Sequence, residues 1–342
     1  MQLSTMLDYS KGIPGSLDAV CDYERAGLDI VWVAEAYGFD GPSQMGYLAA
    51  RTQRLTIGSA ILPIFTRTPA LIAQTAAGLD AVSGGRFILG LGSSGPQVIE
   101  GWHGVAFTEP VERTREIVEI CRRVWRRERL TNDGLYTLPL PPEQGTGLGK
   151  PLKLITRPVR DKIPIWLASM GPKNVEITAE IADGWMPFLF FPERAQAVWG
   201  DALARGTARR EPELAPLEVW GGGLAAVGDG LEHLRDLARP VMALYIGGMG
   251  AKGRNFYNDL ACRYGYEQEA RTIQDLYLEG RKDEAAQAVP AELLEKTSLI
   301  GPPGYVAERI AAFAEAGVTV LNVTPLGPDP LATVETLKSL MA

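Results

Sequence analysis

Histidine and cysteine, the residues that most often build metal sites and nucleophilic centres, are scarce in this sequence. The chain of 342 residues has two histidines, His103 and His233, which gives little basis for a His-liganded zinc site and suggests no Ser-His-Asp arrangement. Its three cysteines, Cys21, Cys121 and Cys262, lie far apart and form no CxxC pair. We interpret them as reduced structural thiols, neither nucleophiles nor ligands, and we expect no metal site.

Long apolar runs and an excess of positive charge are also missing. The formal net charge of -7 argues against a nucleic-acid partner. The densest basic cluster is interleaved with glutamates, as on the solvated face of an amphipathic helix; it consists of Arg122, Arg123, Arg126, Arg127 and Arg129. The apolar stretch 55–66 is too short to span a bilayer, and the N-terminus does not resemble a signal peptide. We therefore expect a cytoplasmic protein without a membrane partner.

The sequence does contain a regular alternation of short apolar runs and helical stretches. Eight runs predict strands, at residues 3–7, 30–34, 55–62, 87–92, 163–168, 184–189, 217–226 and 318–323. Helices are predicted at 16–25 with Ser16 as the cap, from Pro69 to the Gly84-Gly85 pair, and at 111–129, 173–182, 305–316 and 331–340. This order predicts a parallel sheet closed into a (β/α)8 TIM barrel. No GxGxxG motif follows the first strand, which argues against a dinucleotide-binding fold.

Two segments interrupt this alternation. The larger, residues 227–301, lies between the seventh strand and the final helix-strand-helix unit. We expect it to be a mostly helical insertion that packs on the barrel. Residues 131–162 are rich in proline and glycine and are interpreted as an excursion from the barrel. The whole chain, 1–342, is therefore predicted to be one domain.

Function in a barrel of this kind resides in the loops that follow the strands, and two of these loops could bind an anion. The fourth strand ends in Gly92, Ser93 and Ser94, which offer backbone N–H groups and hydroxyls. The fifth strand continues into a helix start formed by Ala168, Ser169, Met170, Gly171, Pro172 and Lys173. Together the loops predict a phosphate site. A glycine-rich turn is also a common plain connector, and Ser169 could simply cap the helix.

The third strand contains an unusual run of small residues, Gly58-Ser59-Ala60, before Ile61. Small residues in a buried strand make room for a large planar ligand against the backbone. The alternative interpretation is a small-residue layer in the barrel core.

Taken together, these segments resemble the luciferase-like monooxygenase superfamily, and in particular its deazaflavin-dependent branch, which includes methylenetetrahydromethanopterin reductase. The resemblance covers nearly the whole chain; it rests on WVAEAY at 32–37, TRTP at 66–69, SGGRF at 83–87, GLGSSGPQ at 90–97 and ADGW at 182–185. It implies a cofactor ring in the barrel mouth, with its phosphate at the loops after the fourth and fifth strands. It also implies a non-prolyl cis peptide between Ala60 and Ile61 that supports the ring.

One departure from the family pattern concerns acid-base residues. Sugar-phosphate dehydrogenases of this branch have an acid and a histidine after the second strand and another acid after the fourth. Glu35 matches the first acid, but Ala36 replaces the histidine and Gly95 replaces the second acid, which argues against the sugar-phosphate reaction. The proton donors left near the mouth are Glu35, Tyr37, Glu100 and His103.

Glu35 and His103 are the catalytic candidates, and Glu35 is also a candidate for contact with the cofactor. Each has an alternative interpretation: Glu35 could form a buried ion pair, and His103 could be a packed core histidine. Arg67 and Arg254 could meet the acidic tail of the deazaflavin, although surface salt bridges are the preferred interpretation of both.

The resemblance implies an oxidoreductase that transfers a hydride between coenzyme F420 and a small organic substrate. A homodimer is the expected assembly. A reduced-FMN monooxygenase on the same fold is one alternative. A flavin-binding or deazaflavin-binding protein without turnover is the other, because the usual acid-base residues are missing.

Overall fold

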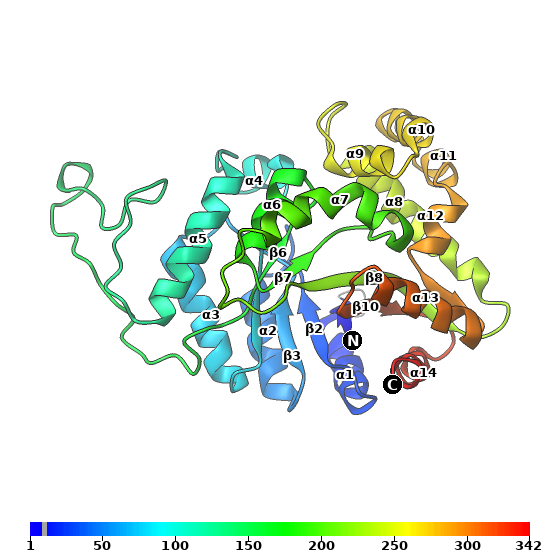
Figure 1. Cartoon of the computed structure of the whole chain (residues 1–342), viewed down its shortest axis with the longest axis horizontal. Helices are drawn as coiled ribbons and strands as arrows, with labels where there is room; N and C mark the ends of the chain where they lie inside the picture. Colours follow the sequence, from blue (N-terminus) through cyan, green and yellow to red (C-terminus); the bar gives the residue numbers. More distant parts are fainter. Residues whose placement is uncertain (9–11) are drawn as a thin grey trace.

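Eight parallel strands form a closed barrel in the computed structural model, which describes residues 1–8 and 12–342 (Figure 1). The ring closes because the last strand pairs with both the first and the seventh. In order around the barrel the strands are β1 (Gln2–Met6), β2 (Ile30–Val33), β3 (Thr56–Ser59), β5 (Phe87–Gly92), β6 (Ile165–Ala168), β7 (Gly184–Met186), β8 (Glu218–Val227) and β10 (Val320–Pro325). The predicted TIM barrel is confirmed.

Helices cover the outside of this barrel. They are α1 (Gly12–Arg25), α2 (Gly41–Arg51), α3 (Pro69–Ser83), α5 (Pro110–Trp125), α6 (Pro172–Ile181), α7 (Pro192–Thr207), α13 (Pro303–Glu315) and α14 (Pro330–Leu340), with the short α4 (Pro96–Gly101) before α5. The prediction that Ser16 caps the first helix is wrong. The helix begins four residues earlier, and the Ser16 hydroxyl donates to the Gly12 carbonyl 3.0 Å away within it. No helix in the described part of the chain is long and apolar enough to cross a membrane.

The amphipathic pattern of α5 is confirmed by its packing. Ile117, Ile120, Cys121 and Val124 are buried, and the Trp125 indole donates to the Ala73 carbonyl of α3 at 3.0 Å. Burial raises the pKa of the Cys121 thiol, so this cysteine stays protonated and unreactive. That agrees with its interpretation as a structural residue.

Tryptophans fill the lower part of the barrel interior. Trp32 and Trp166 are fully buried, with ring centroids 5.2 Å apart. Each indole lies over a glycine of the next strand. Trp32 is in register with Gly58 and Trp166 with Gly184, and a Cβ at either glycine would lie within 2.2 Å of the indole. The alternation of very large and very small residues therefore fills the barrel interior below its mouth.

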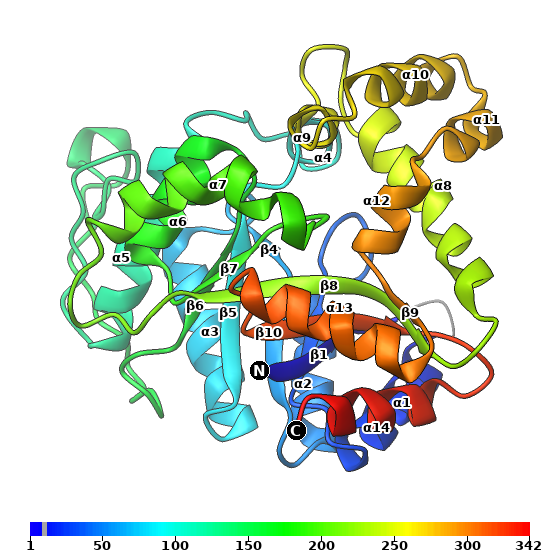
Figure 2. The same cartoon turned by 45° about the vertical axis from the view of Figure 1, so that its right-hand side comes forward.

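The insertion between β8 and α13 is mostly helical and projects over one side of the barrel (Figure 2). Its elements are η2 (Glu232–Ala238), α8 (Arg239–Ala243), the π-helix η3 (Leu244–Gly248), α9 (Phe256–Arg263), α10 (Glu267–Leu278), α11 (Lys282–Gln287) and α12 (Ala291–Lys296). The fully buried Tyr264 anchors it by donating to the Leu189 carbonyl after β7 at 2.7 Å. Its last residues depart from the prediction, because Leu299–Gly301 form strand β9 beside β8.

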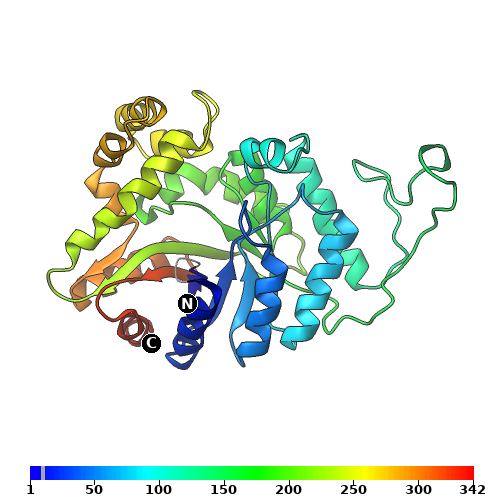
Figure 3. The same ribbon diagram turned by 180° about the vertical axis from the view of Figure 1, so that it is seen from behind.

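Residues 131–162 form a long loop that runs out from the barrel (Figures 1 and 3). The only regular element among them is the short helix η1 (Pro142–Gln144). Glu116 of α5 holds one end of the loop by accepting the Leu135 and Tyr136 N–H groups at 2.8 and 3.1 Å. Near the other end, Arg160 pairs with the fully buried Asp80 of α3. The predicted excursion is confirmed.

Candidate functional site

The inward-facing residues at the mouth of the barrel are small, and those one step below them are Trp32, Gly58, Gly90 and Trp166. Side chains alternate along a strand, so Ala34, Ala60, Gly92 and Ala168 follow the inward positions one step nearer the mouth. Ala60 and Ala168 pack against the tryptophan cluster from above. A Cβ at Gly92 would lie 3.0 Å from Ile61 and 3.4 Å from Ala168. The mouth therefore has a shallow, mostly apolar floor, which suits a flat ring.

A bulge in the third strand shapes one side of this floor. Strand β3 pairs with β5 up to Gly58, and pairing resumes in the short strand β4 (Leu62–Pro63). Between these points the Ser59 hydroxyl replaces the ladder, donating to the Gly90 carbonyl and accepting its N–H, each at 2.8 Å. The peptide bond between Ala60 and Ile61 is cis, so that expectation is confirmed, and the predicted continuous strand is instead two.

The two loops predicted to bind a phosphate lie side by side. Gly92 and Ala168 are the last paired residues of β5 and β6, so the segments that follow them leave the barrel next to each other. Each leads into a helix whose N-cap is a glycine, Gly95 for α4 and Gly171 for α6, followed by a proline. Neither helix has a side-chain cap. At the start of α6 the Lys173 and Asn174 N–H groups remain available for an anion at the mouth, whereas α4 offers only the Gln97 N–H, because Val98 donates to the Gly95 carbonyl at 3.0 Å.

The side chains of these loops differ in whether their polar groups already have hydrogen-bond or ion-pair partners. Among the described residues, the Ser93 hydroxyl reaches only the Ser94 carbonyl, at 3.3 Å, and Ser94 has a left-handed backbone with φ of 58°. Lys173, in the first turn of α6, is exposed and has no ion-pair partner in the described part of the chain. Ser93, Ser94 and Lys173 therefore keep donors available for a ligand.

Ser169 is not the cap of α6, and its contact with the cofactor stays a prediction. Its hydroxyl is buried and shares a hydrogen bond of 2.8 Å with Thr178 of α6, so it is not the helix cap. The same bond occupies the Ser169 hydroxyl, which is therefore not free to donate to a phosphate. The carbonyls of Ser169 and Met170 accept the indole N–H groups of Trp185 and Trp199, at 2.9 and 3.0 Å. This loop therefore offers its helix start, and not its serine hydroxyl, to an anion.

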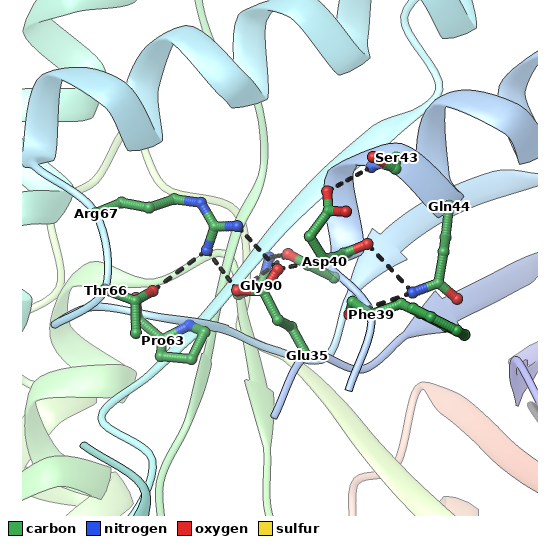
Figure 4. A network of polar contacts seen from close by, with 11 residues as sticks. Glu35, Phe39, Asp40, Ser43, Gln44, Pro63, Thr66, Arg67 and Gly90 are labelled. Atoms are coloured by element: carbon green, nitrogen blue, oxygen red, sulfur yellow. Dashed lines mark hydrogen bonds and ion pairs between the residues drawn. The ribbon is translucent and has the colours of Figure 1, made fainter. Parts of the chain in front are cut away.

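Glu35 follows β2 and joins three elements of the rim (Figure 4). Its carboxylate pairs with both Arg67 guanidinium ends, the longer contact being 2.8 Å, and accepts the Gly41 N–H at the start of α2 at 2.7 Å. The two side chains are 10% and 14% exposed. The structure thus shows the buried ion pair considered as an alternative for Glu35, and the surface salt bridge preferred for Arg67 is wrong because both partners are shielded. With both oxygens occupied, Glu35 is poorly suited to donate a proton.

The Glu35–Arg67 pair is expected to stabilise the rim. Replacing Glu35 with glutamine leaves the shielded Arg67 charge without its counterion, and we expect a loss of about 2 kcal/mol in the free energy of unfolding. Urea denaturation measures this loss. The control is Asp22→Asn, which breaks the exposed pair with Arg25 and should change stability little. Equal losses in the two variants would contradict a buried structural role for Glu35.

The other predicted proton donors are dispersed around the mouth. His103 follows α4; its Nε2 is buried and has no hydrogen-bond partner among the described residues, and the structure records no contact between it and Glu35. Glu100 accepts the Phe107 N–H at 3.2 Å. Tyr37 is 64% exposed and lies beside the equally exposed Trp102, their ring centroids 6.5 Å apart. The structure thus does not assemble these residues into one acid-base group.

Two cavities flank the rim. One, of about 300 Å³, is bounded by the β2 loop, α4 and the end of the π-helix; its lining is Tyr37, Gln97, Val98, Gly101, Trp102, Gly248 and Met249. The other, of about 440 Å³, lies between the β4–α3 loop and the segment before α5, and its lining includes Arg67, Arg113, Thr66, Thr68 and Thr108. Arg113 has no carboxylate partner among the described residues and stands over the rings of Phe65 and Tyr136. The first cavity is neutral, and the second carries positive charge.

Sequence reasoning missed an aromatic cluster where the insertion meets the barrel. It consists of Phe188, Tyr245 and Tyr257, whose ring centroids are 4.3 to 5.0 Å apart. One signal was present, because Phe188 continues the inward alternation of Gly184 and Met186. The tyrosines gave no signal, since nothing local shows that residues in a helical insertion return to a strand end.

The family of the chain follows from comparison with known proteins. The family model for luciferase-like monooxygenases matches residues 3–320. A protein of Mycobacterium tuberculosis assigned as a coenzyme F420-dependent oxidoreductase is 42% identical over 331 residues, 95% of each chain. The 5,10-methylenetetrahydromethanopterin reductase of Archaeoglobus fulgidus is 26% identical over 321 residues, 91% of this chain and 90% of its own.

Solved structures agree on the fold. The coenzyme F420-dependent tetrahydromethanopterin reductase of Methanopyrus kandleri superposes with a TM-score of 0.80 at 19% identity, covering 98% of this chain and 96% of its own. The shared barrel and the match along nearly the whole sequence lead to one conclusion. The chain belongs to the luciferase-like monooxygenase family.

Proposed function

We propose that the protein is an F420-dependent oxidoreductase that transfers a hydride between the deazaflavin and a small organic substrate. The observation that carries this proposal is the pair of uncapped helix starts, at Gly95 and Gly171, beside the shallow floor of Ala60, Gly92 and Ala168. A phosphate-bearing planar cofactor matches both features. The names of the relatives in Mycobacterium tuberculosis and Archaeoglobus fulgidus support F420 as that cofactor.

The phosphate, the ring and the acidic tail of such a cofactor would each contact a different part of the barrel mouth. Ser93, Ser94 and the first N–H groups of α6 would hold the phosphate, with Lys173 adding positive charge. The bulge at Ala60 and Ile61 would support the ring. The cavity that contains Arg113 would accept the acidic tail. The bound deazaflavin supplies hydride chemistry, while the protein binds it, orients it and keeps water from its ring.

Turnover of reduced F420 tests this function. With purified protein and no oxygen, we expect reduced F420 to be oxidised only when an unsaturated, imine or carbonyl acceptor is added; absorbance of the oxidised cofactor reports the reaction. The control is the same mixture without protein. Binding of F420 without turnover for any acceptor would indicate a binding protein. In a second assay in air, oxygenation of an added substrate that requires both the protein and reduced FMN, and that reduced F420 does not support, would indicate a monooxygenase.

A further inference from the structure

An arm, residues 139–159, projects from the barrel on the outer side of α5 (Figures 1 and 3). The chain is paired where the arm begins and again near its return. Asn132 and Leu138 form an antiparallel bridge with backbone hydrogen bonds of 2.7 and 2.8 Å. On the returning side, the Leu130 N–H donates to the Leu152 carbonyl at 2.8 Å. The base of the arm is therefore fixed, and the arm is held in a defined direction away from the barrel.

The arm presents apolar side chains to the outside of the molecule. Ile155 is 94% exposed and Leu148 is 83% exposed. Leu140, Leu152 and Val159 are at least half exposed. A long loop without regular structure is uncommon in a compact domain and is usually functional. A group of exposed apolar side chains of this kind marks an interaction surface.

Leu154 shows that the fold needs only part of this apolar material. Its side chain packs against the core of the barrel, and its carbonyl accepts the Arg127 Nε–H at 3.2 Å. Ile155, the next residue, contributes almost nothing to the buried surface. The stability of the isolated chain therefore gives no reason for an isoleucine at this exposed position, and we look for that reason in a partner.

The charge of the arm is opposite to that of the rest of the chain. Lys150, Lys153 and Arg157 stand against one acidic residue, Glu143, which gives the arm a net charge of +2. Since the whole chain carries -7, the rest of the chain, which we call the body, carries -9. The three basic side chains are exposed and form no ion pair in the part of the chain that the structure describes.

This distribution of charge selects among possible partners. A basic and apolar arm could also approach an anionic membrane. The body would then be repelled by the same lipids that attract the arm, because its net charge is negative. A second copy of the chain meets no such conflict, since it offers an acidic body to the arm. Charge complementarity therefore favours a second copy.

We propose that the arm is a docking surface for a second copy of this chain and that it lies on the acidic body of that copy. The negative charge of the partner attracts Lys150, Lys153 and Arg157, while the contact removes Leu148 and Ile155 from water. Two copies related by a two-fold axis each extend an arm onto the other, so the same contact is made twice. Two arms packed on each other would instead bring like charges together.

Sedimentation velocity of the full chain at micromolar concentrations tests this proposal. We expect the wild-type protein to be a dimer, and Leu148→Ser with Ile155→Ser to raise the dimer Kd at least roughly tenfold. The matched control is Leu237→Ser with Val241→Ser, which changes two exposed residues of η2 and α8 on the opposite side of the barrel (Figure 1). This control should keep the wild-type Kd. All four positions are exposed, so urea denaturation should show wild-type stability in both variants.

A second pair of substitutions tests where the arm lies. Lys150→Glu with Lys153→Glu should also raise the dimer Kd, and this effect should shrink at high salt because salt screens exposed charges. Tighter dimers in this variant would mean that the arms pack on each other, which overturns the proposed position. Hydrogen exchange of the wild-type protein gives a readout without substitution: backbone N–H groups of residues 143–157 should exchange more slowly as the protein concentration rises.

The remaining outcomes overturn the proposal. A wild-type protein that stays monomeric has no second copy on its arm. A dimer whose Kd is unchanged by Leu148→Ser with Ile155→Ser, or weakened equally by the control pair, forms through another surface. Exchange in the arm that does not depend on concentration has the same meaning. Flotation of the monomer with phosphatidylserine vesicles would assign the arm to a membrane surface instead.

Discussion

Replacing Ser93 and Ser94 together with aspartate lowers the affinity of the protein for F420 at least tenfold, roughly 1.4 kcal/mol. These serines follow β5 beside the segment that leads into α6. In the described part of the chain their hydroxyls make one weak contact, from Ser93 to the Ser94 carbonyl at 3.3 Å. Two carboxylates there would repel the cofactor phosphate. Aspartate tolerates the left-handed backbone of Ser94, whose φ is 58°, so the loop itself should persist. Fluorescence titration with F420 measures the effect.

The control for this double variant is the corresponding pair of asparagines. Asparagine has nearly the size of aspartate and the same tolerance of a left-handed backbone, but it carries no charge. We expect the asparagine variant to bind F420 much better than the aspartate variant. If the aspartate variant bound with the wild-type Kd, the phosphate would lie elsewhere. Equal losses in the two variants would point to crowding and not to charge.

The substitution Gly90→Ala is expected to reduce the free energy of unfolding by about 3 kcal/mol. An added Cβ would lie 1.8 Å from the Ser59 carbonyl oxygen and 2.9 Å from Met186. The first of these neighbours is backbone, so the strand itself has to move. Movement of Ser59 also breaks its two 2.8 Å hydrogen bonds to Gly90, which hold the bulge at Ala60. Cofactor affinity should therefore fall together with stability.

Gly78→Ala is the matched control for Gly90→Ala. A Cβ at Gly78, on the exposed side of α3, has no neighbour within 4 Å. Alanine in a helix interior is favoured over glycine by roughly 0.5–1 kcal/mol, so this variant should be as stable as the wild type or more so. Urea denaturation of both variants gives the comparison. A Gly90→Ala protein with wild-type stability and F420 affinity would contradict the role assigned to the bulge.

The barrel was predictable because local pattern and architecture agree. Runs such as 30–34 and 163–168 are buried on both faces and therefore read as continuous apolar segments. The boundaries of helices and strands were harder to predict where side-chain hydrogen bonds or pairing with distant strands determine them. Ser16 looked like a helix cap but lies inside α1, and Leu299–Gly301 became a strand only because β8 offers an edge there. Neither outcome can be derived from local propensity.

The candidate site was predictable to the extent that it follows strand ends. The loops at Gly92 and Ala168 were expected to converge, and their register confirms it. The cis peptide at Ala60-Ile61, expected from the family resemblance, is also present. The alternative that Ser169 caps α6 is wrong, because Gly171 is the N-cap and the Ser169 hydroxyl shares a hydrogen bond with Thr178.

Contacts between distant parts of the chain could not be predicted from the sequence pattern. The pairing of Glu35 with Arg67 joins two loops around the rim. The approach of Tyr245 to Phe188 depends on how a long insertion folds back, which hydrophobic periodicity does not encode. Both contacts join segments far apart in the sequence, so the arrangement of side chains around the mouth was the least predictable feature of the site.

Parallel titrations of the purified protein with F420 and with FMN test the central claim most directly. The account predicts that F420 binds at least tenfold more tightly than FMN, roughly 1.4 kcal/mol or more, and that the paired aspartates at Ser93 and Ser94 remove most of this affinity. Tenfold tighter binding of FMN would contradict the account and would favour a reduced-FMN monooxygenase on the same barrel.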